Sequence, residues 1–165
     1  MRLSFSIAAE PDATALAALH TEVSQNLTDH YGRGPWTAVT REKGVLFGMR
    51  HSTVLVARRG TRIVGTLQLA TKKPCAVDVS YFTPVKTALY LTHMAVTPAL
   101  QRQGIGQRLL EQATKHARAF SANAIRLDAF DAEAGAGGFY AKSGYREVGH
   151  TTYRKAPLIY YELLL

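Results

Sequence analysis

The sequence predicts an α/β protein in which a single mixed sheet is flanked by helices. The chain has 165 residues, which is the length of one domain, so a single domain over residues 1–165 is expected. Segments with apolar residues at every second position alternate with segments at helical spacing, and no repeat or linker separates them. The predicted order is β-α-α-β-β-β-α-β-α-β-β, which is typical of one mixed sheet.

The first half of the chain contains three predicted strands and two predicted helices. Alternation of apolar with polar residues, as at Leu3, Phe5 and Ile7, indicates the strands. Apolar residues three or four apart indicate the helices, the first of which opens on a Pro–Asp pair and ends near Gly32. The predicted elements are a strand at 2–9, helices at 11–32 and 41–49, and a hairpin with strands at 53–58 and 62–70.

The second half contains four further strands, two helices and one long connection. The strands are expected at 88–96, 124–129, 145–153 and 157–164, and the helices at 104–120 and 132–142. The connection at 71–87 contains two prolines and is longer than most loops. Two interpretations of it stay open, recognition of an acceptor substrate or a solvent-exposed excursion with a short strand.

The charge balance indicates an anionic partner. Twenty Lys and Arg against twelve Asp and Glu leave a formal charge of +8, which suits nucleic acid, a membrane surface or a small phosphorylated molecule. The basic residues are scattered, which argues against nucleic acid, and no apolar segment predicts a membrane span or a secretory leader. Cys75 is the single cysteine, as expected in a reducing cytoplasm, and no histidine spacing predicts a metal site.

A turn between the strand at 88–96 and the following helix predicts a phosphate site. Gly104 and Gly106 allow a ligand to approach the backbone closely, and the helix start directs unpaired N–H groups and a positive dipole outward. Arg102 and Arg108 add positive charge. The segment 104–107 reads Gly-Ile-Gly-Gln, so it lacks the Gly-Lys-Ser/Thr of a P-loop and the third glycine of a dinucleotide fingerprint.

Two motifs resemble those of the GNAT superfamily of acyl-CoA N-acyltransferases. The first is Gln101-x-x-Gly104-x-Gly106 after the strand, and the second is the segment 139–145, Phe-Tyr-Ala-Lys-Ser-Gly-Tyr. The resemblance covers residues 88–150 in sequence and almost the whole chain in its order of elements. It implies a mostly antiparallel GNAT-type sheet, acetyl-CoA as co-substrate, no metal, and direct acetyl transfer to an amine acceptor in a ternary complex.

The resemblance also assigns roles to individual residues. Tyr140 stands at the position of the general acid that protonates the departing thiolate, and a phenol is still protonated at neutral pH. The strand residues Met94, Ala95 and Val96 would hold the pantetheine arm through their backbone. The pyrophosphate would be held by the backbone of the turn, which consists of Gln101, Arg102, Gln103, Gly104, Ile105 and Gly106.

The sequence leaves the base, the acceptor and the oligomeric state open. The general base is His93, Glu133 or a water molecule, and Glu133 replaces an asparagine that the family commonly uses to contact the cofactor arm. The acceptor is a small amine, a protein amine or an antibiotic amine, and the protein is a monomer or a homodimer. Two competing functions are a non-catalytic acyl-CoA-binding module and a basic nucleic-acid-binding domain.

Overall fold

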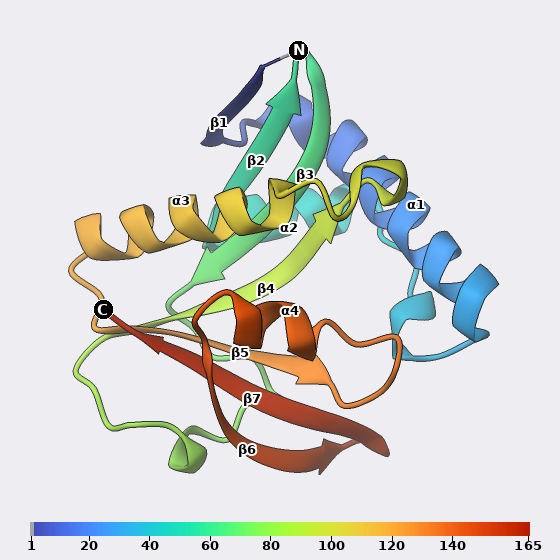
Figure 1. Ribbon diagram of the computed structural model, residues 1–165. Helices are drawn as coiled ribbons and strands as arrows, with labels where there is room; N and C mark the ends of the chain where they lie inside the picture. Colours follow the sequence, from blue (N-terminus) through green and yellow to red (C-terminus); the bar gives the residue numbers. More distant parts are fainter. Residues whose placement is uncertain (1) are drawn as a thin grey trace. The chain divides into compact units, whose positions relative to one another are not determined.

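Seven strands and four α-helices follow one another in the predicted order in the computed structural model, which describes residues 2–165 (Figure 1). Most of the element ends lie within two residues of those expected from the sequence. The elements are β1 Leu3–Ile7, α1 Ala13–Tyr31, α2 Glu42–His51, β2 Thr53–Arg59, β3 Arg62–Ala70, β4 Ala88–Val96, α3 Ile105–Ala119, β5 Ala124–Phe130, α4 Gly137–Lys142, β6 Arg146–Tyr153 and β7 Ala156–Leu164.

The strands are ordered β1-β2-β3-β4-β5-β7-β6 in one sheet. The β4–β5 pair is parallel, and the β1–β2, β2–β3, β5–β7 and β6–β7 pairs are antiparallel. This pattern confirms the predicted α/β class with a mixed, mostly antiparallel sheet. By internal contacts the chain divides into two compact units, and β4 contributes residues to both.

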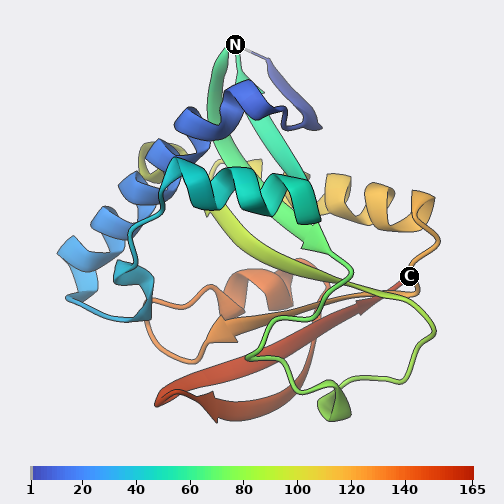
Figure 2. The same cartoon turned by 180° about the vertical axis from the view of Figure 1, so that it is seen from behind.

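The first unit contains the described residues up to Leu69 together with Thr92–Ala113. Helices α1 and α2 lie on one face of the strands β2 and β3, and the first part of α3 lies on the other face (Figures 1 and 2). On the α3 face, a Cβ at Gly65 would lie 2.9 Å from the Cδ1 atom of Leu109, so glycine lets α3 approach β3. On the other face, a buried cluster joins α1 to the strands and contains Leu16, Leu19, Val54, Val56, Ile63 and Ala95.

The second unit contains Ala70–Leu91 and Thr114–Leu165. In this unit β4 pairs with β5 through Ala88–Tyr90 and Ala124–Arg126, and β5 pairs with β7 along its whole length up to Phe130. The helix α4 covers one face of β5 and β7, and the 71–87 segment crosses the opposite face (Figures 1 and 2).

The 71–87 segment is packed onto the sheet through its apolar residues. Val77 and Phe82 are buried, and they form a cluster with Tyr90 and Tyr160. The segment contains a 3₁₀ helix at Val79–Tyr81 and no strand. The expected short strand is therefore absent, and although most residues of the segment are exposed, Val77 and Phe82 anchor it to the core of the unit.

A buried carboxylate fastens the end of this segment to the sheet. The side chain of Glu162 on β7 is fully buried, and it accepts hydrogen bonds from the Thr83 N–H (3.1 Å), the Thr83 hydroxyl (2.5 Å) and the Arg146 guanidinium (2.5 Å). Arg126 on β5 is also buried and donates to the Thr83 carbonyl (2.8 Å) and the Tyr90 hydroxyl (3.1 Å). Thr83 is thus held by both charged groups.

The start of α4 differs most from the sequence prediction, at Gly137 and not at residue 132. A side chain on Gly135 would overlap the carbonyl group of Phe130, so the chain at 131–136 lies too close to the end of β5 for a helical residue with a Cβ. Glu133 consequently precedes the helix, where its side chain is exposed.

Candidate functional site

The predicted anion-binding turn belongs to the first unit and has a tightly bonded backbone. After β4, a 3₁₀ helix at Pro98–Leu100 brings the Gln101 N–H to the Pro98 carbonyl (3.2 Å), and the Gln101 side chain donates to the Val96 carbonyl (3.1 Å). Arg102 and Gly104 follow with φ angles of +61° and +79°. These left-handed residues turn the chain sharply, and a Cβ on Gly104 would face open space.

The first turn of α3 supplies the N–H groups that suit an anion. The helix begins at Ile105, and the Arg108 N–H donates to the Gly104 carbonyl (3.1 Å), which closes the first helical turn. The N–H groups of residues 105–107 therefore precede the first intrahelical bond and point out of the helix start, where the helix dipole is positive. Because the Gln101 N–H is used within the turn, the donors suited to a pyrophosphate lie closer to α3 than the sequence indicated.

At the end of β4, successive residues direct their backbone N–H and C=O groups to opposite sides of the strand. The Thr97 N–H donates to the Val64 carbonyl of β3 (2.9 Å), and alternate residues of a strand direct their backbone groups to the same side. Ala95 and Thr97 thus face β3, whereas Met94 and Val96 direct their N–H and C=O groups to the opposite side. Of the three strand residues predicted to hold a pantetheine arm, Met94 and Val96 have the suitable direction.

His93, just before this edge, has an unusual backbone conformation for a strand residue. Its φ angle is +50°, in the left-handed region, and its Nδ1 atom lies 3.0 Å from the Thr92 hydroxyl. The ring meets that of His20 on α1 edge-on, with centroids 6.1 Å apart. Burial lowers the pKa of His93, and burial together with the His93 ring lowers the pKa of His20 to about 4. Both rings are therefore neutral at pH 7.

Tyr140, the predicted general acid, lies on α4 in the second unit and is buried. Its ring contacts those of Phe139, Tyr145 and Tyr161, with centroid distances of 5.3, 5.9 and 6.1 Å. Burial and the negative charge of Asp128 raise the pKa of the Tyr140 phenol well above its usual value. The hydroxyl therefore keeps its proton across the physiological range, as an acid for a thiolate must.

A packing contact that the sequence did not reveal explains why residue 137 is glycine. A Cβ there would lie 2.7 Å from the Tyr161 hydroxyl, so the first turn of α4 rests directly on β7. Gly138, by contrast, is exposed and has no atom within 4 Å of its Cβ position.

The two neighbouring glycines are expected to respond to alanine in opposite directions. Gly137→Ala should destabilise the protein by about 1–3 kcal/mol because the new methyl group meets the Tyr161 hydroxyl. Gly138→Ala should stabilise it by about 0.5–1 kcal/mol, since alanine is the better helix former. Urea unfolding measures both, and addition of Tyr161→Phe should restore most of the loss at 137. Equal effects of the two substitutions would contradict this packing.

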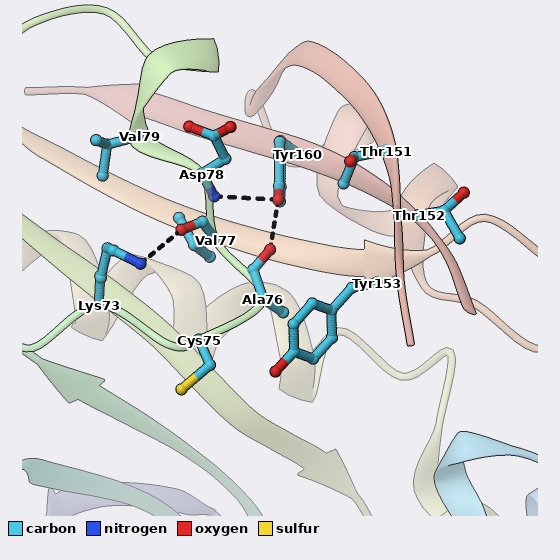
Figure 3. Close-up of a pocket in the computed structure, with 10 residues that line it drawn as sticks. All are labelled: Lys73, Cys75, Ala76, Val77, Asp78, Val79, Thr151, Thr152, Tyr153 and Tyr160. Atoms are coloured by element: carbon cyan, nitrogen blue, oxygen red, sulfur yellow. Dashed lines mark hydrogen bonds between the residues drawn. The ribbon is translucent and has the colours of Figure 1, made fainter. Parts of the chain in front are cut away.

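A pocket of about 360 Å³ lies between the 71–87 segment and β6 (Figure 3). The Tyr160 hydroxyl holds one wall in place, because it accepts from the Asp78 N–H (3.1 Å) and donates to the Ala76 carbonyl. Lys73 donates to the Val77 carbonyl (2.9 Å). Residues 151–153 of β6 add three hydroxyl groups. Acceptor recognition by the 71–87 segment stays a prediction, and this polar pocket is where the segment offers room for a small molecule.

Residues 2–165 contain neither a cluster of metal ligands nor a membrane-spanning helix. In that part of the chain no three His, Cys, Asp or Glu side chains are grouped so that they could hold a metal ion. None of the helices there combines the length and the apolar character needed to cross a bilayer.

Solved structures with a similar fold are N-acetyltransferases and related proteins. Ribosomal-protein-alanine N-acetyltransferase from Brucella melitensis superposes with a TM-score of 0.76 at 18% identity, with 98% of this chain and 99% of that chain covered. The protein yncA of Salmonella typhimurium, solved with its cofactor acetyl-CoA, gives 0.72 at 15% identity over 99% and 94%. Aminoglycoside 6'-acetyltransferase type Ii gives 0.72 at 17% identity over 98% and 96%. At these low sequence identities, the structural similarity establishes the fold of this chain and not its substrate.

Sequence comparison is informative at the level of the family. A comparison with curated proteins gave no match. The model of the acetyltransferase (GNAT) family matches residues 15–145, which include the turn at Gln101–Gly106 and the whole second motif at 139–145. The chain therefore belongs to the GNAT family of acetyltransferases.

Proposed function

We propose that the protein is a cytoplasmic N-acetyltransferase that moves the acetyl group of acetyl-CoA directly to a primary amine. The observation that carries the proposal is the turn at Gln101–Gly106, where two left-handed residues lead into the open start of α3. Its donors suit the pyrophosphate of CoA, and Arg102 and Arg108 bring positive charge to the same segment. The exposed free thiol of Cys75 supports a reducing compartment.

The strand β4 would receive the pantetheine arm along the edge formed by Met94 and Val96. These residues direct backbone groups away from β3, and within residues 2–165 the register of β4 with β5 covers Ala88–Tyr90. An arm that lies along this edge would run beside backbone groups that point away from β3, one of which, the Val96 carbonyl, accepts from the Gln101 side chain. A backbone N–H of the same edge would also stabilise the charge that develops on the carbonyl oxygen of the acetyl group.

Proton transfers at two positions complete the proposed reaction. The amine nitrogen attacks the acetyl carbon, the C–S bond breaks, and the proton of the Tyr140 hydroxyl passes to the sulfur. A second group accepts the proton that the amine nitrogen loses. Much of the rate would come from holding the two substrates together, and no covalent bond to the enzyme is needed.

Of the two candidate bases, we propose His93 in preference to Glu133. Its imidazole is neutral at pH 7 because burial lowers its pKa, and it directly precedes Met94 on the edge proposed for the arm. Both side chains are exposed, but Glu133 lies in the turn before α4 and not on β4. A neutral imidazole can accept a proton, whereas an imidazolium cannot.

His93→Gln is expected to lower kcat by about 10²-fold or more, since this is the usual size of a general-base contribution. In the wild type, kcat/KM should rise with pH through a pKa below 6.5 and then reach a plateau, and the variant should lose this limb. His51→Gln, at the exposed end of α2, is the matched control and should keep the wild-type profile. An unchanged kcat in His93→Gln would point to a base other than His93.

The proposed function is tested by mixing the protein with acetyl-CoA and a panel of amines and following release of free CoA thiol. The panel includes a peptide with N-terminal alanine, a lysine-containing peptide, free amino acids and an aminoglycoside. Thiol release that depends on one amine supports the proposal and identifies the acceptor class. Tight acetyl-CoA binding without transfer to any amine would indicate a binding module instead.

A further inference from the structure

The pocket between the 71–87 segment and β6 has two opposite charges in its walls, and these charges do not pair with each other (Figure 3). The ammonium group of Lys73 donates to the Val77 carbonyl (2.9 Å). The Oδ1 atom of Asp78 accepts from the N–H (3.0 Å) and the hydroxyl (2.7 Å) of Ser80. The salt bridges in the described part of the chain include neither Lys73 nor Asp78. Hydrogen bonds from Ser80, followed by the charge of Lys73, lower the pKa of Asp78, which is therefore ionised at pH 7.

The other walls of this pocket are polar and fixed by the sheet. Its volume of about 360 Å³ is typical of a small-molecule site. Thr151 and Tyr153 alternate along β6 on the face that Tyr160 occupies on β7, so their hydroxyl groups add to the wall that Tyr160 holds in place. The Arg154 guanidinium lies over the Tyr153 ring, 5.2 Å from its centroid, and brings a second positive charge to this wall. A ligand in the pocket therefore meets charges of both signs together with hydroxyl groups.

A small molecule that carries both charges complements these walls. The Lys73 ammonium has further N–H groups that its bond to Val77 does not use, and a carboxylate accepts from such donors. The Oδ2 atom of Asp78 has no partner among the described residues, so it can accept from an ammonium group. A ligand with only one charge would gain one of these contacts and be repelled by the wall of like charge. We infer that the pocket binds a free α-amino acid, with its carboxylate at Lys73 and its ammonium group at Asp78.

This site is separate from the proposed acid Tyr140. Tyr160 and Tyr161 are consecutive residues of β7, so their side chains lie on opposite faces of the sheet. Tyr160 lines the pocket, whereas the Tyr161 ring packs against that of Tyr140, with centroids 6.1 Å apart. In addition, an amine bound at Asp78 is an ammonium ion and has no lone pair with which to attack an acetyl group. The bound amino acid is therefore not the acetyl acceptor, and the inference does not depend on the proposed function.

Cys75 lines the same pocket and offers a direct test, because it is the single cysteine of the chain and is exposed. The rate of its alkylation by iodoacetamide, a neutral reagent, is measured by mass spectrometry with each common amino acid other than cysteine, in the absence of acetyl-CoA. An amino acid that fills the pocket should lower this rate about tenfold at ten times its dissociation constant. The N-acetyl derivative and the amide of the same amino acid each lack one charge and should leave the rate nearly unchanged.

Two substitutions test the two charges one at a time. Lys73→Met removes the positive charge and keeps an apolar stem, so it should weaken binding of the protecting amino acid about tenfold or more. Lys72→Met is the matched control, because Lys72 is exposed and does not line the pocket, and it should keep the wild-type protection. Asp78→Asn removes the negative charge, and its amide oxygen can still accept from Ser80, so this variant decides the matter if Lys73→Met does not fold.

Protection of Cys75 that needs both charges of the amino acid, and that either pocket variant weakens, supports the inference. An alkylation rate that no amino acid lowers at millimolar concentration would overturn it. Protection that the N-acetyl derivative and the amide share, or that Lys73→Met and Asp78→Asn both keep, would overturn it as well. None of these results bears on acetyl transfer, because acetyl-CoA is absent from the assay.

Discussion

Tyr140→Phe is expected to lower kcat for acetyl transfer by about 10²- to 10⁴-fold, the usual contribution of a positioned general acid. Phenylalanine keeps the ring contacts with Phe139 and Tyr161 on the face of α4, so the fold should tolerate the substitution. The affinity for acetyl-CoA should be nearly unchanged, since the proposed pyrophosphate donors are backbone N–H groups of residues 105–107 at the start of α3. A loss confined to kcat is the signature of an interaction made in the transition state.

Steady-state kinetics and calorimetric titration with acetyl-CoA measure these two quantities separately. Tyr161→Phe is a suitable control, because it removes a phenol from the same aromatic cluster and leaves the proposed acid in place. If Tyr140→Phe turns over at the wild-type rate from pH 6 to 9, the thiolate departs without protonation by this residue. The acid role would then be wrong, whatever the acceptor is.

Glu162→Leu should destabilise the protein by about 3–5 kcal/mol, the size expected when one member of a buried charged cluster is removed. The substitution deprives Thr83 of two hydrogen bonds. It also leaves Arg126, which faces Glu162 in the β5–β7 register, with a buried charge and no facing carboxylate. Arg146→Leu is the comparison variant, since the Arg146 side chain is 64% exposed and should contribute only about 1 kcal/mol or less. Urea unfolding at pH 7 distinguishes the two.

The Glu162 carboxylate should also make the stability of the protein depend on pH in the acid range. Burial alone would raise the pKa of Glu162, but the hydrogen bonds from Thr83 and Arg146 outweigh it and hold the pKa below the ordinary value of 4.5. Its contribution is therefore complete above that pH and is lost as the pH falls through the lower, folded-state pKa. The stability difference between the wild type and Glu162→Leu should shrink in this acid range. A difference that stays constant down to pH 2 would contradict the assignment.

The order of elements was predictable because each strand and helix carries its own apolar periodicity. The start of α4 was not, because its position depends on contacts of Gly135 with Phe130 and of Gly137 with Tyr161, which come from other elements. The same holds for the 71–87 segment. Its buried Val77 contacts Tyr160, more than eighty residues further along the chain, and no local pattern records such a pair.

The candidate site, too, was predictable from the sequence only in part. The turn at Gln101–Gly106 was predictable, because a strand, two glycines and a helix start adjoin in sequence. Sequence could name His93, but it could not show the left-handed backbone of that residue or its contact with His20. The unpaired charges of Lys73 and Asp78 were equally hidden, since an unpaired group is defined by all of its neighbours in space.

Binding of acetyl-CoA tests the central claim most directly. The Tm of the wild-type protein should rise steadily with acetyl-CoA concentration, and the stabilisation should reach about 2.7 kcal/mol at a hundred times the dissociation constant. Gly104→Val should weaken this response strongly, because a β-branched residue is strained at the φ of +79° that the turn requires. A Tm that does not change with acetyl-CoA or free CoA at millimolar concentration would contradict the account.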